Sequence, residues 1–245
     1  MTDKHNISLD GHIERPKHMS PAEIRDGCEY KSGGDETEIR VCEINEEFRQ
    51  GFNVLLDHDK HEKSITFWGS ARTPEGSEYY EKARRLGKRI GELGYTVVTG
   101  GGPGIMEGGN RGAFEAGAQS IGATIDLPFE QYTNPYVTEE IPFYYFFSRK
   151  VILGFSAEAY LYFPGGFGTF DEFFEMLTLI QTKKIPALPI ILVGKDFWQP
   201  FVDVIKKQML DTFDTISPED MDLFQVLDDE DDIVEIIKNA PQRDE

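Results

Sequence analysis

Cysteine is scarce in this chain of 245 residues, and the two that are present, Cys28 and Cys42, both lie near the N-terminus. They have neither C-x-x-C spacing nor nearby histidines in the pattern of a metal site, so no metal is predicted. A reducing compartment is therefore expected. The chain also lacks an apolar run as long as a membrane span, and its first residues lack the apolar stretch of a signal peptide. These absences favour a soluble, cytoplasmic protein.

Basic side chains are also few. The chain has 25 Lys and Arg against 44 Asp and Glu, which gives a formal net charge of -19. A field of this sign repels nucleic acids and anionic lipid surfaces, so neither is an expected partner. An anionic ligand would need a local cluster of donors, because the protein as a whole does not attract it. The basic residues close to glycine-rich loops are therefore the most informative ones.

The composition divides the chain into a polar leader and one domain. Residues 1–42 are charged and turn-rich, and they are predicted to form a flexible or loosely docked N-terminal extension. Residues 43–245 are long enough and apolar enough to bury one core, and are predicted to be a single domain. At its start, apolar residues recur at helical spacing, which predicts a helix over residues 44–56.

Apolar segments and helical patterns alternate along the rest of the chain. The segments predicted as buried parallel strands are Ile65–Trp68, Thr96–Thr99, Ile121–Leu127, Ala159–Phe163 and Leu188–Val193. Helices are predicted over residues 75–93, 105–116, 149–155, 170–182, 197–210 and 231–238. This alternation predicts an α/β fold with a Rossmann-like, doubly wound parallel sheet. Ligands of such sheets bind at the carboxyl ends of the strands. The aromatic run 143–147 is expected in the core or at a subunit contact.

Two strand-to-helix turns are rich in glycine, at residues 100–104 and 165–168. Neither fits G-x-G-x-x-G, and the chain has no G-x-x-x-x-G-K-[ST] loop, so the standard dinucleotide fingerprint is absent and ATP hydrolysis of that kind is not supported. Glycine still allows backbone N–H groups to approach an anion at a helix start. Either loop alone could be only a tight turn, but two at one sheet edge favour a phosphate-bearing ligand.

Thr169 and Glu172 have two interpretations. They form T-x-x-E just before an apolar stretch, which is the pattern of a capping box. Alternatively, Glu172 lies beside a phosphate cradle and faces the sugar of a ligand. The pattern leaves both interpretations open.

Five stretches of the chain carry a resemblance to a known family. They are FWGSAR (67–72), GGGPGIMEGGNRGA (100–113), LPFEQYTNPYV (127–137), SRK (148–150) and PGGFGTFDE (164–172). In this order they resemble the motifs of the Lonely Guy (LOG) family, whose members are cytokinin riboside 5'-monophosphate phosphoribohydrolases or act on ordinary nucleoside monophosphates. The resemblance extends from Phe48 to the last helix. Many relatives are labelled lysine decarboxylases, but the sequence offers no argument for a pyridoxal site.

The resemblance implies an N-glycosidase without a cofactor. Its reaction would be hydrolysis of the N-glycosidic bond of a nucleoside 5'-monophosphate, of the AMP or cytokinin riboside monophosphate type, to free base and ribose 5-phosphate. Arg149 and Glu172 would be the catalytic pair. The phosphate would be held by Gly165, Gly166, Gly168 and Thr169. The resemblance also implies a homodimer with sites near the subunit contact.

The chemistry of the reaction agrees with these assignments. Glycosidic cleavage passes through an oxocarbenium-like sugar, so a carboxylate such as Glu172 can stabilise positive charge and activate water. The guanidinium of Arg149 suits either the departing base or the phosphate. Other predicted substrate-binding residues are Ser70, Arg72, Gly101, Gly102, Gly104, Met106, Glu107 and Lys150. For Glu107, bonding to ribose hydroxyls and complementing the helix dipole are both open. Glu130 and Asn134 are further candidates in the loop after the third strand.

A different class of function is also compatible with the glycine loops. Similar folds serve as carriers of a phosphorylated small molecule such as a pterin-type cofactor, and a carrier would use the cradle without breaking a bond. The pair Arg149 and Glu172 separates the two hypotheses, because a carrier would not need it.

Overall fold

The computed structural model describes residues 18–55, 63–127, 132–155 and 157–241. In this part of the chain, seven parallel strands form one sheet in the order β4-β3-β2-β1-β5-β6-β7. The strands are β1 (Ser64–Trp68), β2 (Thr96–Thr99), β3 (Ser120–Ile125), β4 (Glu139–Phe143), β5 (Ala159–Tyr162), β6 (Ile190–Val193) and β7 (Gln225–Leu227). The prediction of an α/β fold with a doubly wound parallel sheet is confirmed.

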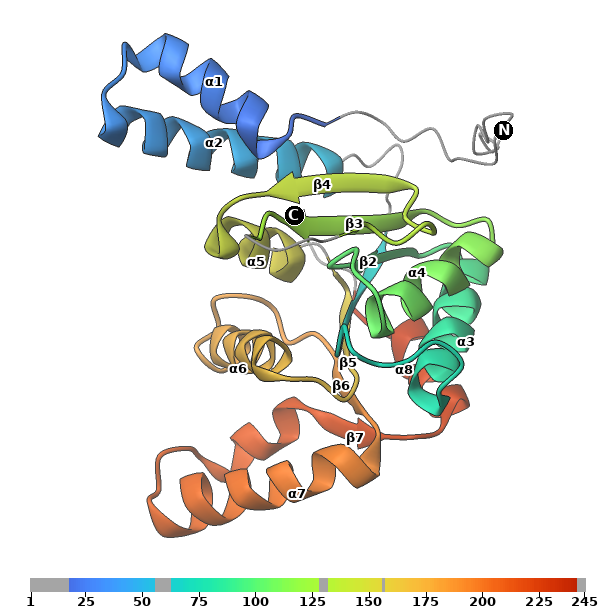
Figure 1. Ribbon diagram of the computed structural model, residues 1–245. Helices are drawn as coiled ribbons and strands as arrows, with labels where there is room; N and C mark the ends of the chain where they lie inside the picture. Colours follow the sequence, from blue (N-terminus) through green and yellow to red (C-terminus); the bar gives the residue numbers. More distant parts are fainter. Residues whose placement is uncertain (1–17, 56–62, 128–131, 156, 242–245) are drawn as a thin grey trace.

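Helices cover both faces of the sheet (Figure 1). One face carries α3 (Glu78–Glu92), α4 (Ile105–Glu115) and α8 (Glu230–Lys238), and the other carries α5 (Phe146–Phe155), α6 (Phe167–Gln181) and α7 (Lys195–Ile205). A π-helical segment, η1 (Lys206–Thr212), continues α7, and a 3-10 turn, η2 (Pro218–Leu223), follows it. Each face buries its own apolar cluster, as expected for strands covered on both sides.

The strand order places three loops at one edge of the sheet. β1 pairs with β2 on one side and with β5 on the other, so the direction in which strands are added reverses between β1 and β5. The loops that follow β1 and β5 therefore leave the sheet side by side, and the loop after β2 lies next to them. A crevice at such a point of reversal is where open α/β sheets bind their ligands.

Two strands were not predicted from the sequence pattern. β7 is short, and its residues are only partly buried or exposed. β4 is an edge strand that alternates buried and half-buried residues and contains two acids and a proline, a composition that is unusual in a central strand. Its first residue, Glu139, is buried, and Glu139 Oε1 lies 2.9 Å from Nε2 of His18. A partner from far along the sequence thus compensates for the buried acid.

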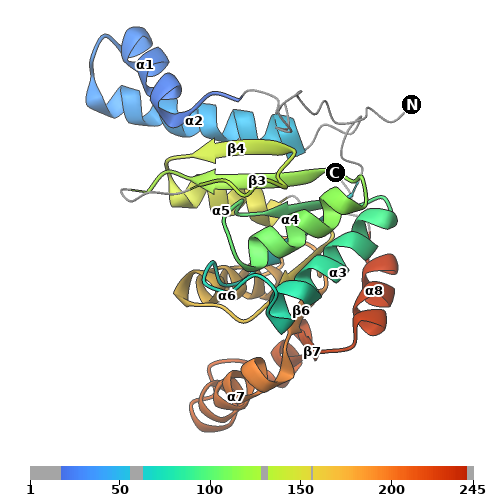
Figure 2. The same cartoon turned by 45° about the vertical axis from the view of Figure 1, so that its right-hand side comes forward.

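A helical hairpin precedes the sheet. It consists of α1 (Pro21–Ser32) and α2 (Glu36–Leu55), and Figures 1 and 2 show it lying along β4 at the edge of the sheet. Ser20 and Glu23 form a capping box at the start of α1, and a disulfide joins Cys28 of α1 to Cys42 of α2. The spacing of the cysteines did not predict this bond, so cysteine usage no longer supports the expectation of a reducing compartment.

Buried acids dock the hairpin on the sheet edge. Glu47 of α2 accepts a hydrogen bond from the backbone N–H of Tyr144 (2.6 Å) and another from the Ser148 hydroxyl, and burial raises the pKa of Glu47. The Tyr145 hydroxyl donates to Glu43 (2.6 Å). The prediction of a loosely docked leader is therefore wrong for residues 18–42, which form helices that cover an edge strand.

Candidate active site

A cavity of about 1050 Å³ opens at the reversal point, where the loops after β1 and β5 meet. We call it the first cavity. The residues from these loops that line it are Gly69, Ser70, Ala71, Arg72, Gly165, Gly166, Phe167, Gly168 and Thr169. Gly100, Met106, Arg149 and Glu172 also line it, and aromatic residues of α6 and α7 extend it on one side. The structure thus brings together most of the residues that the sequence predicted for the site.

The loop after β5 offers free backbone donors to this cavity. α6 begins at Phe167 with Gly166 as its N-cap, and no side chain caps the helix. The first N–H groups of a helix have no partner within it, and they lie at the positive end of its dipole. A Cβ added at Gly166 or Gly168 would meet nothing within 4 Å, so both glycines face open space. The loop can hold an anion such as a phosphate.

Glu172 lies in the second turn of α6 and lines the first cavity. Because the helix begins two residues before Thr169, the interpretation of Thr169 and Glu172 as a capping box is wrong. Side chains in a helix lean toward its N-terminus, so Glu172 leans toward the loop with the free donors. Burial raises the pKa of Glu172 to about 7, and the opposing influence of Arg149 does not cancel this effect. The carboxyl group is therefore about half ionised near neutral pH.

Arg149 reaches the cavity from α5. Its Nε donates to the carbonyl of Ala123 within β3 (2.7 Å), which fixes the side chain and leaves the two terminal nitrogens for a ligand. The guanidinium lies directly over Gly100, since a Cβ there would be 2.2 Å from one terminal nitrogen. Burial lowers the pKa of Arg149, while Glu172 raises it. An arginine remains charged under these conditions, so the cavity contains a fixed cation.

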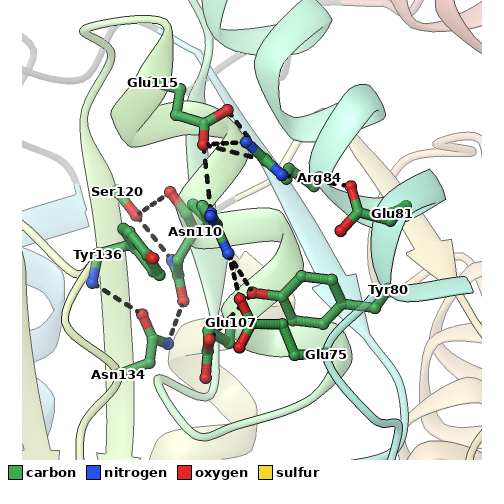
Figure 3. A network of polar contacts seen from close by, with 11 residues as sticks. Glu75, Tyr80, Glu81, Arg84, Glu107, Asn110, Glu115, Ser120, Asn134 and Tyr136 are labelled. Carbon is green, nitrogen blue, oxygen red and sulfur yellow. Dashed lines mark hydrogen bonds and ion pairs between the residues drawn. The ribbon is translucent and has the colours of Figure 1, made fainter. Parts of the chain in front are cut away.

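A buried polar network holds the other glycine loop in place, and Figure 3 shows the part of it that Asn110, Ser120 and Asn134 form. Asn110 of α4 accepts hydrogen bonds from Thr99 (2.6 Å) and Asn134 (2.9 Å), and it donates to Ser120 (2.8 Å). The amide of Asn134 also donates to the carbonyls of Gly101 (3.1 Å) and Gly102 (3.0 Å). Asn134, a candidate for substrate contact, therefore supports the backbone of the loop.

The loops after β1 and β2 are in direct contact. The backbone N–H of Ile105 donates to the carbonyl of Ser70 (3.1 Å), and a Cβ at Gly104 would lie 2.4 Å from the same oxygen. Gly104 also has a φ of +70°, which favours glycine. The Ser70 hydroxyl accepts a hydrogen bond from the backbone N–H of Arg72 (3.0 Å), and both residues line the cavity.

Some predicted residues lie elsewhere. Glu107 accepts hydrogen bonds from Tyr80 (2.9 Å) and Tyr132 (3.5 Å) and does not line the first cavity. Lys150 does not line it either, and pairs with Asp171 (2.8 Å) and with Glu175 on α6. Substrate contacts by these residues stay predictions.

The other glycine candidates lie outside the wall of the first cavity. Gly104 is a packing position without a place in the cavity wall, whereas Gly101 and Gly102 line a neighbouring cavity that is described below. Glu130 lies outside the described residues.

Sequence reasoning missed several residues of the cavity wall. Phe197 and Phe201 of α7 belong to no motif, and nothing in the sequence shows that α7 reaches the cavity. Trp68 could have been found, because it is the last residue of β1 at the binding edge. Its indole stacks on Tyr162 with ring centroids 4.8 Å apart, and its buried Nε1 has no hydrogen-bond partner in the part of the chain that the structure describes.

The described residues show neither a metal cluster nor a membrane-spanning helix. They contain no group of three or more His, Cys, Asp or Glu side chains that could hold a metal ion. None of their helices combines the length and the apolar character that a membrane span needs.

Comparisons with known sequences agree with the motif pattern. A cytokinin riboside 5'-monophosphate phosphoribohydrolase of Rhodococcoides fascians is 24% identical over 156 residues, which cover 62% of this chain and 79% of that protein. The cytokinin riboside 5'-monophosphate phosphoribohydrolase LOG of Oryza sativa subsp. japonica is 31% identical over 60% of this chain and 61% of its own length. A pyrimidine/purine nucleotide 5'-monophosphate nucleosidase of Escherichia coli K12 is 31% identical over 53% of this chain, but the match spans only 30% of that enzyme.

Solved structures share the fold. A molybdenum cofactor binding protein from Rippkaea orientalis superposes with a TM-score of 0.53 at 22% identity and covers 72% of this chain and 96% of its own. The molybdenum cofactor carrier protein of Chlamydomonas reinhardtii gives a TM-score of 0.51 at 23% identity, over 73% of this chain and 98% of its own. The family model described as "possible lysine decarboxylase" matches residues 106–237, more than half of the chain. With this match, and with LOG proteins among its relatives, the chain belongs to the LOG family.

Proposed function

We propose that the protein hydrolyses the N-glycosidic bond of nucleoside 5'-monophosphates and releases the free base and ribose 5-phosphate. One observation carries the proposal. A carboxyl group with a pKa of about 7, Glu172, lies in the same cavity as a fixed arginine, Arg149, and an uncapped helix start. Relatives that are 24% to 31% identical bear the names of enzymes with this activity.

The phosphate of the substrate binds at the start of α6. The backbone N–H groups of Phe167, Gly168 and Thr169 are the first of the helix, and Gly166 leaves the approach open. Arg72 lines the same cavity and adds a positive charge in a protein whose overall field is negative. A phosphate held here positions the ribose next to the second turn of α6.

Glu172 then lies where the sugar reacts. As the C1'–N bond breaks, its electron pair leaves with the base, and positive charge develops on the ribose. The ionised carboxylate stabilises that charge and accepts a proton from the attacking water, whose oxygen forms the new bond to C1'. The same proton then passes to the nitrogen of the departing base, which leaves Glu172 ionised again. The terminal nitrogens of Arg149 donate to the departing base or to the phosphate.

The family description also suggests pyridoxal chemistry, and the residues do not fit it. A pyridoxal enzyme needs a lysine whose amine forms a Schiff base. No lysine is among the described residues that line the first cavity. Lys150 of α5, which directly follows Arg149, is paired with two acids of α6. We therefore derive no step through this cofactor.

The alternative function is that of a carrier for a phosphorylated small molecule. This chain shares the fold of the two molybdenum cofactor proteins. At 22% to 23% identity, this similarity supports a common fold and not a common function. A carrier gains nothing from a buried carboxyl group whose charge is costly to maintain. Glu172 thus favours the hydrolase.

The test is release of base from nucleotides. Purified protein is incubated with AMP, with other nucleoside monophosphates and with a prenylated AMP, and free base is measured by chromatography. We expect release from at least one nucleotide and none from adenosine, which lacks the phosphate. Turnover should also rise with pH through about 7, because the ionised form of Glu172 acts.

Two variants separate catalysis from binding. Glu172→Gln should lower turnover by about a thousandfold or more while nucleotide still binds, because the amide can neither take a proton nor carry the charge. Asp171→Asn is the matched control, since Asp171 is the neighbouring acid on the exposed side of α6 and pairs with Lys150. Full activity of the Glu172→Gln variant would rule out the mechanism.

We also propose a homodimer whose subunit contact lies near the site. Four residues at the wall of the first cavity leave apolar surface exposed to solvent, namely Phe167 (98%), Phe174 (39%), Phe201 (41%) and Val204 (57%). An apolar area next to a ligand cavity is typical of a surface that another subunit covers. Sedimentation analysis should give twice the mass of the chain, and a purely monomeric species would contradict the proposal.

A further inference from the structure

A second cavity, of about 610 Å³, adjoins the first. Ala71, Gly100, Met106 and Arg149 line both cavities, so the two meet at these residues. Arg149 lies at this boundary with its Nε fixed on the carbonyl of Ala123. A ligand whose phosphate is held at the start of α6 can therefore extend past Arg149 into the second cavity.

The helical hairpin forms part of the wall of the second cavity. Ser20, Pro21 and Ala22, at the start of α1, line it. This segment is held in place because the backbone N–H of Met19 donates to Gln50 Oε1 (2.8 Å) and Gln50 Nε2 donates back to the carbonyl of Met19 (3.2 Å). The hairpin precedes residues 106–237, which the family model matches. This part of the wall is thus supplied by a segment outside the family match.

The polar groups of the second cavity are mostly hydrogen-bond acceptors. Asp126 and Glu140 supply carboxylates, and the hydroxyls of Thr124 (3.1 Å) and Thr133 (2.7 Å) both donate to Glu140 Oε1. Each hydroxyl already donates its one proton to Glu140, so its oxygen can only accept a hydrogen bond from a ligand. Among the described residues that line this cavity, Arg149 is the one cation.

We propose that the second cavity binds the nucleobase and selects bases that carry an exocyclic amino group, such as adenine and cytosine. This inference rests on the proposed hydrolysis of nucleoside monophosphates. The amino group donates to the oxygens of Thr133 and Glu140, while the phosphate stays in the first cavity because two carboxylates repel it from the second.

The preference follows from what the competing bases present. Hypoxanthine and uracil carry a carbonyl oxygen where adenine and cytosine carry the amino group. That oxygen would face acceptors and leave them without a donor, which is costly where the base keeps water out. Sites built to bond a donor discriminate strongly against analogues that lack it. Phe146, which also lines the cavity, offers an aromatic face for the ring of any base and therefore does not discriminate.

The first experiment compares nucleotides in pairs. Values of kcat/KM are measured for AMP against IMP and for CMP against UMP, because each pair differs chiefly in the amino group. We expect at least a tenfold preference for the amino member of each pair. In Thr133→Val, which removes one acceptor and the donor that orients Glu140, we expect this ratio to fall severalfold.

The second experiment fills the cavity from the hairpin side. Ala22→Phe places a large side chain at a position that lines the second cavity and is exposed on the helix, so the fold should tolerate it. We expect at least a tenfold loss of kcat/KM for AMP, with unchanged affinity for ribose 5-phosphate, which occupies the first cavity alone. Asp26→Phe adds the same ring to an exposed position of α1 and should change neither quantity.

The outcomes separate this inference from the proposed function. Equal cleavage of AMP and IMP together with an unaffected Ala22→Phe variant would overturn the inference and leave the hydrolase intact. If no nucleotide is cleaved, the hydrolase proposal fails. Calorimetric titration with AMP and with IMP then tests by affinity whether the second cavity selects bases with an amino group. Equal affinities in that titration would overturn the inference.

Discussion

The two glycine loops have similar sequences but different physical reasons for their glycines. In the loop at residues 100–104, the protein itself occupies the space that side chains would fill. Arg149 lies over Gly100, and the carbonyl of Ser70 lies against Gly104. In the loop at residues 165–168, only Gly165 packs against the protein, through Thr169, whereas Gly166 and Gly168 face open space. Gly166 and Gly168, which no packing contact explains, are the glycines to which we assign the phosphate.

This difference assigns separate tasks to the two loops. The first loop is held by Asn110 and Asn134 and lies under the guanidinium of Arg149, so it acts as a rigid support. The second loop presents the free N–H groups of α6. Substitutions should therefore damage stability in the first loop and ligand binding in the second.

The largest effect is expected at Gly104 in the first loop. Gly104→Ala would place a Cβ 2.4 Å from the backbone oxygen of Ser70, at a residue with a φ of +70°. Backbone must move to relieve the clash, and we expect a loss of about 4 kcal/mol in the free energy of unfolding. Urea denaturation measures it. A loss below about 1 kcal/mol would show that the contact between the two loops is not needed.

A smaller loss is expected when the network under the first loop is broken. Asn134→Ala removes the donor for the carbonyls of Gly101 and Gly102 and for Asn110, and leaves these buried acceptors short of a partner. Gly101 keeps the backbone N–H of residue 134 and Asn110 keeps the Thr99 hydroxyl, whereas the carbonyl of Gly102 loses the amide donor. We expect a loss of about 2 kcal/mol. Asn239→Ala, at an exposed asparagine that follows α8, is the control and should cost about 0.5 kcal/mol or less. Similar losses in the two variants would argue against a rigid support.

The second loop should respond in the opposite way. Gly168→Ala puts a methyl group into open space at the start of α6, so the stability should change by no more than about 0.5 kcal/mol. The methyl group would occupy the place of a phosphate oxygen, and the affinity for ribose 5-phosphate should fall at least about tenfold, or 1.4 kcal/mol. Titration calorimetry measures it.

The matched control for Gly168→Ala is Gly27→Ala. Gly27 lies in α1 and its added Cβ would also meet nothing within 4 Å, but it is not part of either cavity wall. This control should leave the affinity for ribose 5-phosphate unchanged. Unchanged affinity in Gly168→Ala as well would place the phosphate somewhere other than the start of α6.

Most of the sheet could be predicted because buried parallel strands are short apolar runs between glycines and prolines. β4 escaped because an edge strand tolerates the acids Glu139 and Glu140, and because the partner of the buried Glu139, His18, is distant in sequence. The helix predicted over residues 44–56 overlaps the second half of α2, whereas α1 and the start of α2 escaped because they bury few apolar residues, among them Ile24 and Ile39. A disulfide joins these two segments. Patterns of hydrophobicity do not show such constraints.

The candidate site could be predicted only in part. Motifs identified the loops after β1, β2 and β5, which follow the strands in sequence and meet at the sheet edge. They could not place Phe201 of α7 or Ala22 of α1 at the cavities, because such contacts depend on how helices pack. The residue at which α6 begins also decides the role of Glu172. Only the structure shows that α6 begins at Phe167 and that Glu172 is therefore free of a capping role.

The smallest effect is expected at Glu172, which lies in the first cavity one turn of α6 after the second loop. The pKa of its carboxyl group is raised from about 4.5 to about 7, mainly by burial. A group of this kind favours the folded state at low pH, and the benefit is lost as the pH rises through 7. Glu172→Gln has no such titration, so it should be more stable than the parent protein at pH 8 by about 1 kcal/mol and show almost no gain at pH 5. The gain is below the full linkage value because the carboxyl group faces a cavity. Thermal unfolding of both proteins across this pH range measures it, and a gain independent of pH would mean that Glu172 is ionised throughout.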